Sequence, residues 1–259
     1  MNEVRNSLKE RLARGEVASS MTVRLTRGIE IAQLAKTAGF DSLYIDLEHS
    51  SLSLETTSQI CVAALGCGIA PLARVPQVEM IQRVLDGGAL GIIAPDVRTA
   101  AQAREIVRAV KYPPLGERGF ATALPHFQYR SLPAKDGYAA LNEATMVIVQ
   151  FESAEGVDNA EAIFAVEGVD MALFGTNDLT ADMGIPGDYA NPRVRDAYAR
   201  AIAAARKHGK HVGVGGLASR PDLMAEYVRQ GARYVSTGTD LSFLLAAAAE
   251  KAKFVREIT

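Results

Sequence analysis

The chain has 259 residues, a formal net charge of −2 and 48% hydrophobic residues. This length suits one large α/β domain or two small ones, and the apolar content excludes a disordered chain. The charge gives no electrostatic reason to expect nucleic acid or an anionic membrane as a partner, and no charge-free apolar stretch reaches the roughly 18 residues of a membrane-spanning helix.

The N-terminal segment, MNEVRNSLKERLARGE, is polar and charged and lacks the apolar centre of a signal peptide. Two cysteines, Cys61 and Cys67, lie in the apolar segment ICVAALGCGIA, where we interpret them as reduced core residues and not as a metal pair or a redox site. We therefore expect a cytoplasmic protein.

Strand-forming runs alternate with helical patterns along the chain. In chain order, the predicted strand and helix of each unit cover residues 17–23 and 28–38, 42–46 and 56–65, 70–75 and 79–88, 91–95 and 100–110, 146–151 and 156–166, 169–174 and 193–209, 211–215 and 220–231, and 234–238 and 240–258. The segment from Lys111 to Ala144 interrupts this alternation, and its Pro, Gly and Tyr content predicts an ordered functional loop with short helices.

These units predict a closed (β/α)8 barrel, the TIM barrel, because their strands are continuous apolar runs typical of strands covered on both faces. An open doubly wound sheet is the alternative. No flexible linker divides the chain, so we expect a single barrel domain over residues 1–259. The last predicted helix is apolar around most of its circumference. It is either an ordinary barrel helix or one that packs against, or is exchanged with, a partner subunit.

Residues at the carboxyl ends of barrel strands line the active site. Charged groups there are costly to bury unless they are paired, protonated or bound to metal. The second to eighth predicted strands end in or lead into Asp46, Glu48 and His49; Arg74; Pro95 and Asp96; Gln150 and Glu152; Gly175, Thr176, Asn177 and Asp178; Gly213, Gly215 and Gly216; and Ser236, Thr237 and Gly238. This convergence predicts a functional site.

Glu152 and Asp178 follow consecutive strands, so their carboxylates can approach one another. Two close anions raise one another's pKa unless a positive charge lies between them. A hard divalent cation with oxygen ligands meets this need, and Mg²⁺, Mn²⁺ and Co²⁺ all suit such a site. The alternative is that Asp178 caps the short helix that follows and Glu152 pairs with an arginine.

His49 differs from the other three histidines because it alone lies at the carboxyl end of a strand. A neutral imidazole there can act as a general base, although a structural hydrogen bond is the other interpretation. Arg74 can hold a carboxylate or stabilise an oxyanion, or it can be a structural ion-pair partner for Glu48 or Asp46.

Six segments together resemble the HpcH/HpaI aldolases, which are metal-dependent class II pyruvate aldolases of the phosphoenolpyruvate/pyruvate barrel superfamily, of the 4-hydroxy-2-oxoheptanedioate or 2-keto-3-deoxy-L-rhamnonate aldolase type. The segments are GFDSLYIDLEH, PLARV, VLDGGALGIIAPDV, KYPPLGERG, VIVQFESAEGVDN and VEGVDMALFGTNDLTADMG. The resemblance runs in order from about residue 6 to the last helix. It implies reversible cleavage of 4-hydroxy-2-oxo acids to pyruvate, or hydroxypyruvate, and an aldehyde.

The resemblance also implies roles for single residues. Glu152 and Asp178 would hold the metal, and His49 would be the base. Arg74 would bind the keto oxygen and stabilise the enolate. Asp46 would support the site.

Three further roles follow from the resemblance. Asp86 would orient His49, within one chain or across a subunit contact. Gln150 would place the substrate, and the backbone amides near Asn177 and Asp178 would receive its carboxylate. Family members are typically homo-oligomers, so a hexamer or trimer with an exchanged last helix is expected.

The chain departs from the family at two motifs, where Leu47 replaces a common glycine and Gly175-Thr176-Asn177-Asp178 replaces Gly-Pro-Ala/Ser-Asp. Other activities stay open: an acyl-CoA lyase of the malyl or citramalyl type, a phosphosugar enzyme, or a non-catalytic barrel that binds an oxo acid. A Schiff-base aldolase is disfavoured because no lysine ends an apolar strand.

Overall fold

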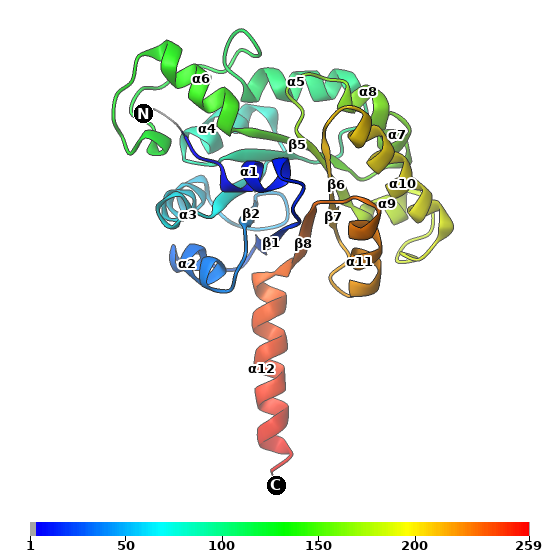
Figure 1. Ribbon diagram of the computed structural model, residues 1–259. Coiled ribbons are helices and arrows are strands. Elements are labelled where there is room, and N and C mark those ends of the chain that lie inside the picture. Colours follow the sequence, from blue (N-terminus) through cyan, green and yellow to red (C-terminus); the bar gives the residue numbers. More distant parts are fainter. Residues whose placement is uncertain (1–3, 259) are drawn as a thin grey trace.

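The structure is a computed structural model that describes residues 4–258. Eight parallel strands pair in chain order and close into a barrel, as predicted (Figure 1). The strands are β1 (Ala18–Val23), β2 (Ser42–Asp46), β3 (Ala70–Arg74), β4 (Gly91–Ala94), β5 (Met146–Phe151), β6 (Met171–Gly175), β7 (His211–Gly215) and β8 (Tyr234–Thr239). The closed barrel rules out the open doubly wound sheet.

Helices follow each strand in the order expected. They are α2 (Glu30–Thr37), α3 (Leu54–Cys67), η1 (Val78–Met80), α4 (Ile81–Asp86), α5 (Ala100–Val110), η2 (Pro125–Phe127), α6 (Ala134–Ala144), α7 (Ala154–Asp158), α8 (Ala160–Phe164), α9 (Thr176–Asp182), α10 (Pro192–Lys207), α11 (Pro221–Gln230) and α12 (Asp240–Arg256). Several helices begin with a side-chain cap. The Ser53 side chain accepts a hydrogen bond from the Thr56 amide, and Thr99 forms a capping box with Gln102.

Two differences from the predicted elements have local causes. The single helix predicted over 156–166 is divided into α7 and α8 at Asn159, whose φ and ψ of −90° and 7° leave the helical region. An additional helix, α1 (Ser7–Ala13), precedes the first strand. The Asn6 side chain caps it by accepting a hydrogen bond from the backbone amide of Lys9.

The α1 helix lies against the amino ends of the strands. Its Leu8 and Leu12 are buried in the same cluster as inward-facing strand residues such as Leu72 and Met171. The Asn6 amide group donates to the carbonyls of Leu90 and Ala144, which immediately precede β4 and β5. The opposite, carboxyl ends of the strands are therefore left for the functional site.

The last helix extends away from the barrel (Figure 1). Only its first turns contact the body, where Phe243 stacks on Phe40 with ring centroids 6.1 Å apart. Its apolar side chains are exposed at Leu244, Leu245 and Val255, among others. This is not the packing of an ordinary barrel helix. Its exchange within a hexamer or trimer, and the single-domain boundary of 1–259, stay predictions.

Both cysteines are free, with Cys61 buried and Cys67 half-buried, as the interpretation of reduced core residues requires. Within residues 4–258, none of the helices has the length and apolar character needed to cross a membrane.

Candidate active site

A pocket of about 510 Å³ opens at the carboxyl ends of the strands. This volume lies within the usual range for small-molecule sites. Five of the predicted site residues line it: His49, Arg74, Gln150, Asn177 and Asp178. The structure therefore brings together side chains at or just beyond the carboxyl ends of β2, β3, β5 and β6, as the barrel prediction implied.

Asp46 and Arg74 form the centre of one side of the pocket. They are register partners on adjacent strands, and Arg74 donates from Nε to Asp46 Oδ1 (2.9 Å) and from Nη2 to Oδ2 (2.7 Å). Burial alone would raise the pKa of Asp46, but the hydrogen bonds and charge of Arg74, with the charge of Arg24, lower it to about 2. The Asp46 carboxylate is thus ionised and fixed in place.

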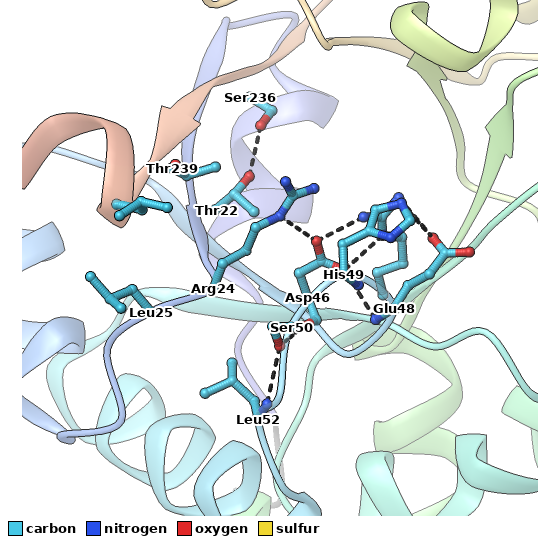
Figure 2. Close-up of polar contacts among 12 residues, drawn as sticks. Thr22, Arg24, Leu25, Asp46, Glu48, His49, Ser50, Leu52, Ser236 and Thr239 are labelled. Carbon is cyan, nitrogen blue, oxygen red and sulfur yellow. Dashed lines mark hydrogen bonds and ion pairs between the residues drawn. The ribbon is translucent and has the colours of Figure 1, made fainter. Parts of the chain in front are cut away.

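Glu48 and His49 lie beside Asp46 (Figure 2). Arg74 Nη1 is 2.8 Å from Glu48 Oε2, so both ion-pair partners proposed for Arg74 from the sequence are real contacts. The His49 ring lies 3.8 Å from the same Glu48 oxygen and is 55% exposed. The backbone amides of Glu48 and His49 donate to Asp46 Oδ1, so Asp46 shapes the turn that carries the histidine.

Glu152 is only 9% exposed. Burial raises its pKa to about 7. The Asp96 amide and the more distant Arg74 charge oppose this rise, and the charges of Asp178 and Glu48 add to it. The Asp96 amide donates to Glu152 Oε2 (2.9 Å), whereas Arg74 Nη1 is 3.8 Å from Oε1.

Gly175 leaves room for the Glu152 side chain. A Cβ atom at position 175 would lie 2.6 Å from both Cγ and Oε1 of Glu152, so a larger residue cannot fit unless Glu152 moves. The α9 helix begins without a side-chain cap, so Asp178 does not have the capping role offered as an alternative. The Glu152 pairing offered with it is present only as the 3.8 Å contact with Arg74.

The donor set around Glu152 and Asp178 fits a hard divalent cation. Both carboxylates offer oxygen ligands, and burial of Glu152 together with the charge of Asp178 raises the pKa of Glu152, an environment that a bound cation would compensate. Gln150 Oε1 adds a buried acceptor with no hydrogen-bond partner, and Gln150 lines the pocket. Across residues 4–258, no group of three or more His, Cys, Asp or Glu side chains forms a closed metal cage, so water and substrate oxygens would complete the coordination.

The departure at the β6–α9 junction has a structural reason. Thr176 Oγ1 is buried, donates to the Gly215 carbonyl (2.6 Å) and lies 2.8 Å from the Tyr198 hydroxyl. Asn177 Oδ1 accepts a hydrogen bond from the Tyr189 hydroxyl (2.7 Å). Side-chain hydrogen bonds therefore fix this turn where the family commonly has proline.

Asp86 lies at the end of α4, and its carboxylate accepts a hydrogen bond from Arg118 (2.6 Å). Among the described residues it makes no contact with His49 within one chain. Its orienting role across a subunit contact stays a prediction, as do the catalytic and binding roles of the other site residues.

Sequence reasoning missed several residues that line the pocket, among them Arg24 and Tyr189. Arg24 directly follows β1, so the rule that singled out the ends of the other strands would also have found it. Tyr189 lies in the loop between α9 and α10, and no sequence signal marks its direction.

Comparison with known proteins gives consistent relationships. Residues 26–247 match the family model described as HpcH/HpaI aldolase/citrate lyase. The chain is 40% identical to the 4-hydroxy-4-methyl-2-oxoglutarate aldolase tasA of Hapsidospora irregularis, over 98% of this chain and 96% of that protein. It is 34% identical to the 2-keto-3-deoxy-L-rhamnonate aldolase of Escherichia coli K12, over 91% and 87%. The crystal structure of an HpcH/HpaI aldolase from Desulfitobacterium hafniense has a TM-score of 0.92 at 30% identity, covering 98% of each chain.

Proposed function

The chain belongs to the HpcH/HpaI aldolase/citrate lyase family, and from this premise we propose that it is a divalent-metal-dependent aldolase. It reversibly cleaves 4-hydroxy-2-oxo acids to pyruvate, or hydroxypyruvate, and an aldehyde or related carbonyl compound. The observation that carries this proposal is the Glu152 carboxyl group, whose pKa burial raises to about 7 and the charge of Asp178 raises further. It lies 3.8 Å from Arg74, and Arg74 lines the pocket together with Asp178 and His49.

Glu152 and Asp178 would hold Mg²⁺, Mn²⁺ or Co²⁺. When bound, such a cation supplies positive charge that stabilises negative charge on the keto oxygen of the substrate. Gln150, with its unpartnered Oε1 in the pocket wall, would help to place the substrate. The substrate carboxylate would lie against the backbone amides near Asn177 and Asp178.

His49 would take the proton from the 4-hydroxyl group. As the C4–O bond becomes a carbonyl, the C3–C4 bond breaks and its electron pair forms the enolate of the oxo acid. Arg74 donates to the enolate oxygen, and Asp46 keeps the Arg74 guanidinium in place. Proton return to C3 gives pyruvate. The exposure of the His49 ring lets it exchange its proton with solvent between turnovers.

A lysine-based mechanism lacks support, because within the described chain no lysine lines the pocket. Lys111 is the one strongly buried lysine there, and it donates to the carbonyls of Asn142 and Thr145. Burial lowers its pKa to about 8.

The test is pyruvate release from a panel of 4-hydroxy-2-oxo acids. We expect EDTA to abolish turnover, added Mg²⁺, Mn²⁺ or Co²⁺ to restore it, and borohydride to trap no adduct. His49→Ala should lose on the order of 10²–10⁴ in kcat, the usual contribution of a general base. His208→Ala, which changes an exposed ion pair with Glu161, is the matched control. Full activity of His49→Ala, or turnover that resists EDTA, would contradict the proposal.

A further inference from the structure

Arg24 lines the pocket but has no part in the proposed reaction. Resting on the proposed function, we propose that Arg24 is a specificity-determining residue that binds a carboxylate on the carbonyl half of the substrate. The preferred substrate is then a short 4-hydroxy-2-oxo dicarboxylic acid, with its second carboxylate close to C4.

Arg24 has hydrogen-bonding capacity that the protein leaves unused. Its Nε donates to Asp46 Oδ2 (2.6 Å), and among the described residues this is the only hydrogen bond of its side chain. A guanidinium has five N–H donors, and its two terminal nitrogens form a fork that matches a carboxylate. The contact with Asp46 through Nε therefore orients the Arg24 guanidinium and leaves that fork available.

Asp46 does not need Arg24 as a partner. Its two oxygens already accept two hydrogen bonds from Arg74 and two from the backbone amides of Glu48 and His49. A second guanidinium on this carboxylate is thus more than the buried ion pair requires, which favours a role of Arg24 toward the pocket.

The main chain of Arg24 is also fixed. Asp240, the first residue of α12, is buried and accepts hydrogen bonds from the amides of Arg24 (3.0 Å), Leu25 (3.1 Å) and Thr26 (2.7 Å). One carboxylate therefore holds the backbone of Arg24 and another holds its side chain. This preorganisation is expected of a binding residue, because less side-chain entropy is lost when the ligand arrives.

The surroundings of Arg24 suit a polar group. Thr22, Ser236, Thr239 and Ser242 line the same pocket, and Thr22 and Ser236 share a 3.0 Å hydrogen bond (Figure 2). An alkyl chain on this side would desolvate several hydroxyl groups without replacing their hydrogen bonds, which is unfavourable. A carboxylate can accept from the arginine and from neighbouring hydroxyls.

The distance between the two arginines limits the length of the substrate. Arg24 Nε and Arg74 Nη2 both lie within hydrogen-bond distance of the same atom, Asp46 Oδ2, at 2.6 and 2.7 Å. The guanidinium groups are therefore neighbours. A substrate whose keto oxygen is on Arg74 reaches Arg24 within a few carbon atoms, so a carboxylate attached directly to C4 fits better than one at the end of a long chain.

The test uses two unreactive ligands that differ only in this carboxylate, 2-oxoglutarate and 2-oxopentanoate. Their Kd values are measured by calorimetry with the Mg²⁺-loaded protein. We expect the wild-type protein to bind 2-oxoglutarate roughly 10- to 100-fold more tightly, the ratio that a charge-assisted hydrogen-bonded pair provides. Arg24→Leu should remove this preference while leaving the Kd of 2-oxopentanoate within about threefold. Arg24→Lys should retain part of it.

Arg27→Leu is the matched control, since Arg27 lies on the same loop and its side chain donates to Ser51 Oγ and the Leu25 carbonyl instead. It should keep the full preference. The inference is overturned if wild-type protein binds both ligands equally or binds neither, or if Arg24→Leu weakens both ligands by the same factor, which would make Arg24 a structural partner of Asp46. Because these outcomes need no turnover, they are separate from failure of the aldolase assay, which would overturn the proposed reaction alone.

Discussion

Two carboxylates at the same barrel mouth have opposite electrostatic environments. Asp46 is fully buried between Arg74 and Arg24, and its pKa falls to about 2. Burial raises the pKa of Glu152 to about 7, because its nearest arginine contact is 3.8 Å long and offsets little of the desolvation, and the charge of Asp178 adds to the rise. Burial acts in the same direction on both, and the difference comes from the partners.

This contrast separates a completed ion pair from a site that needs an additional charge. A buried carboxylate is tolerated when cations and hydrogen bonds compensate its desolvation. The chain provides that compensation at Asp46 and leaves it incomplete at Glu152. The first acid should therefore matter mainly for stability and the second mainly for binding a cation.

The largest expected difference is in stability. Asp46→Asn leaves two arginines without their shared carboxylate and should lower the free energy of unfolding by about 3–5 kcal/mol, as for a broken buried pair. Glu152→Gln should leave the stability of the metal-free protein at pH 8 unchanged or raise it, because the wild-type acid must ionise there despite its raised pKa. Urea denaturation in EDTA measures both. Equal losses in the two variants would remove the distinction.

A second prediction concerns the space beside Glu152. Gly175→Ala should displace the Glu152 side chain and weaken Mn²⁺ binding by about 10- to 100-fold, the usual effect of disturbing the surroundings of a metal ligand. Calorimetric titration with Mn²⁺ measures this change. Gly66→Ala is the control, since a Cβ there meets no atom within 4 Å. Unaltered Mn²⁺ affinity in Gly175→Ala would show that Glu152 does not hold the ion.

The smallest predicted effect is a pH dependence of cation binding. The pKa of Glu152 in the metal-free protein is raised to about 7, so below pH 7 a proton competes with the cation for this carboxylate. Apparent Mn²⁺ affinity should fall toward tenfold per pH unit below 7 and level off above it. Titrations between pH 5.5 and pH 8.5 test this, and Glu152→Gln should flatten the profile. A flat wild-type profile would contradict the raised pKa.

The sequence was sufficient for the barrel and for most of the site because both follow from the ends of apolar strands. That rule singled out Arg74, Gln150 and Asp178, which line the pocket. It also singled out Asp46, which is hydrogen-bonded to Arg74. Arg24 directly follows the first strand, so the same rule applies to it.

Other features depend on contacts that no local pattern contains. The α1 helix is stabilised by burial of Leu8 and Leu12 against the barrel, and its short polar sequence alone does not indicate a helix. The pairing of Asp86 with Arg118 joins residues 32 positions apart through the long loop, so the sequence could suggest a role for Asp86 but not its partner within the chain.

The attachment of α12 to the pocket bears on how the chain can be shortened. The protruding helix is an obvious segment to trim for crystallisation or immobilisation. Its first residue, Asp240, accepts hydrogen bonds from the backbone amides of residues 24–26. A chain ending at Thr239 would therefore also lose the contacts that fix the backbone of Arg24. We expect faster hydrogen exchange at these amides in such a truncated chain and not in one cut several turns later. The first turn of α12 therefore supports the pocket wall that Arg24 lines, whereas the rest of the helix does not.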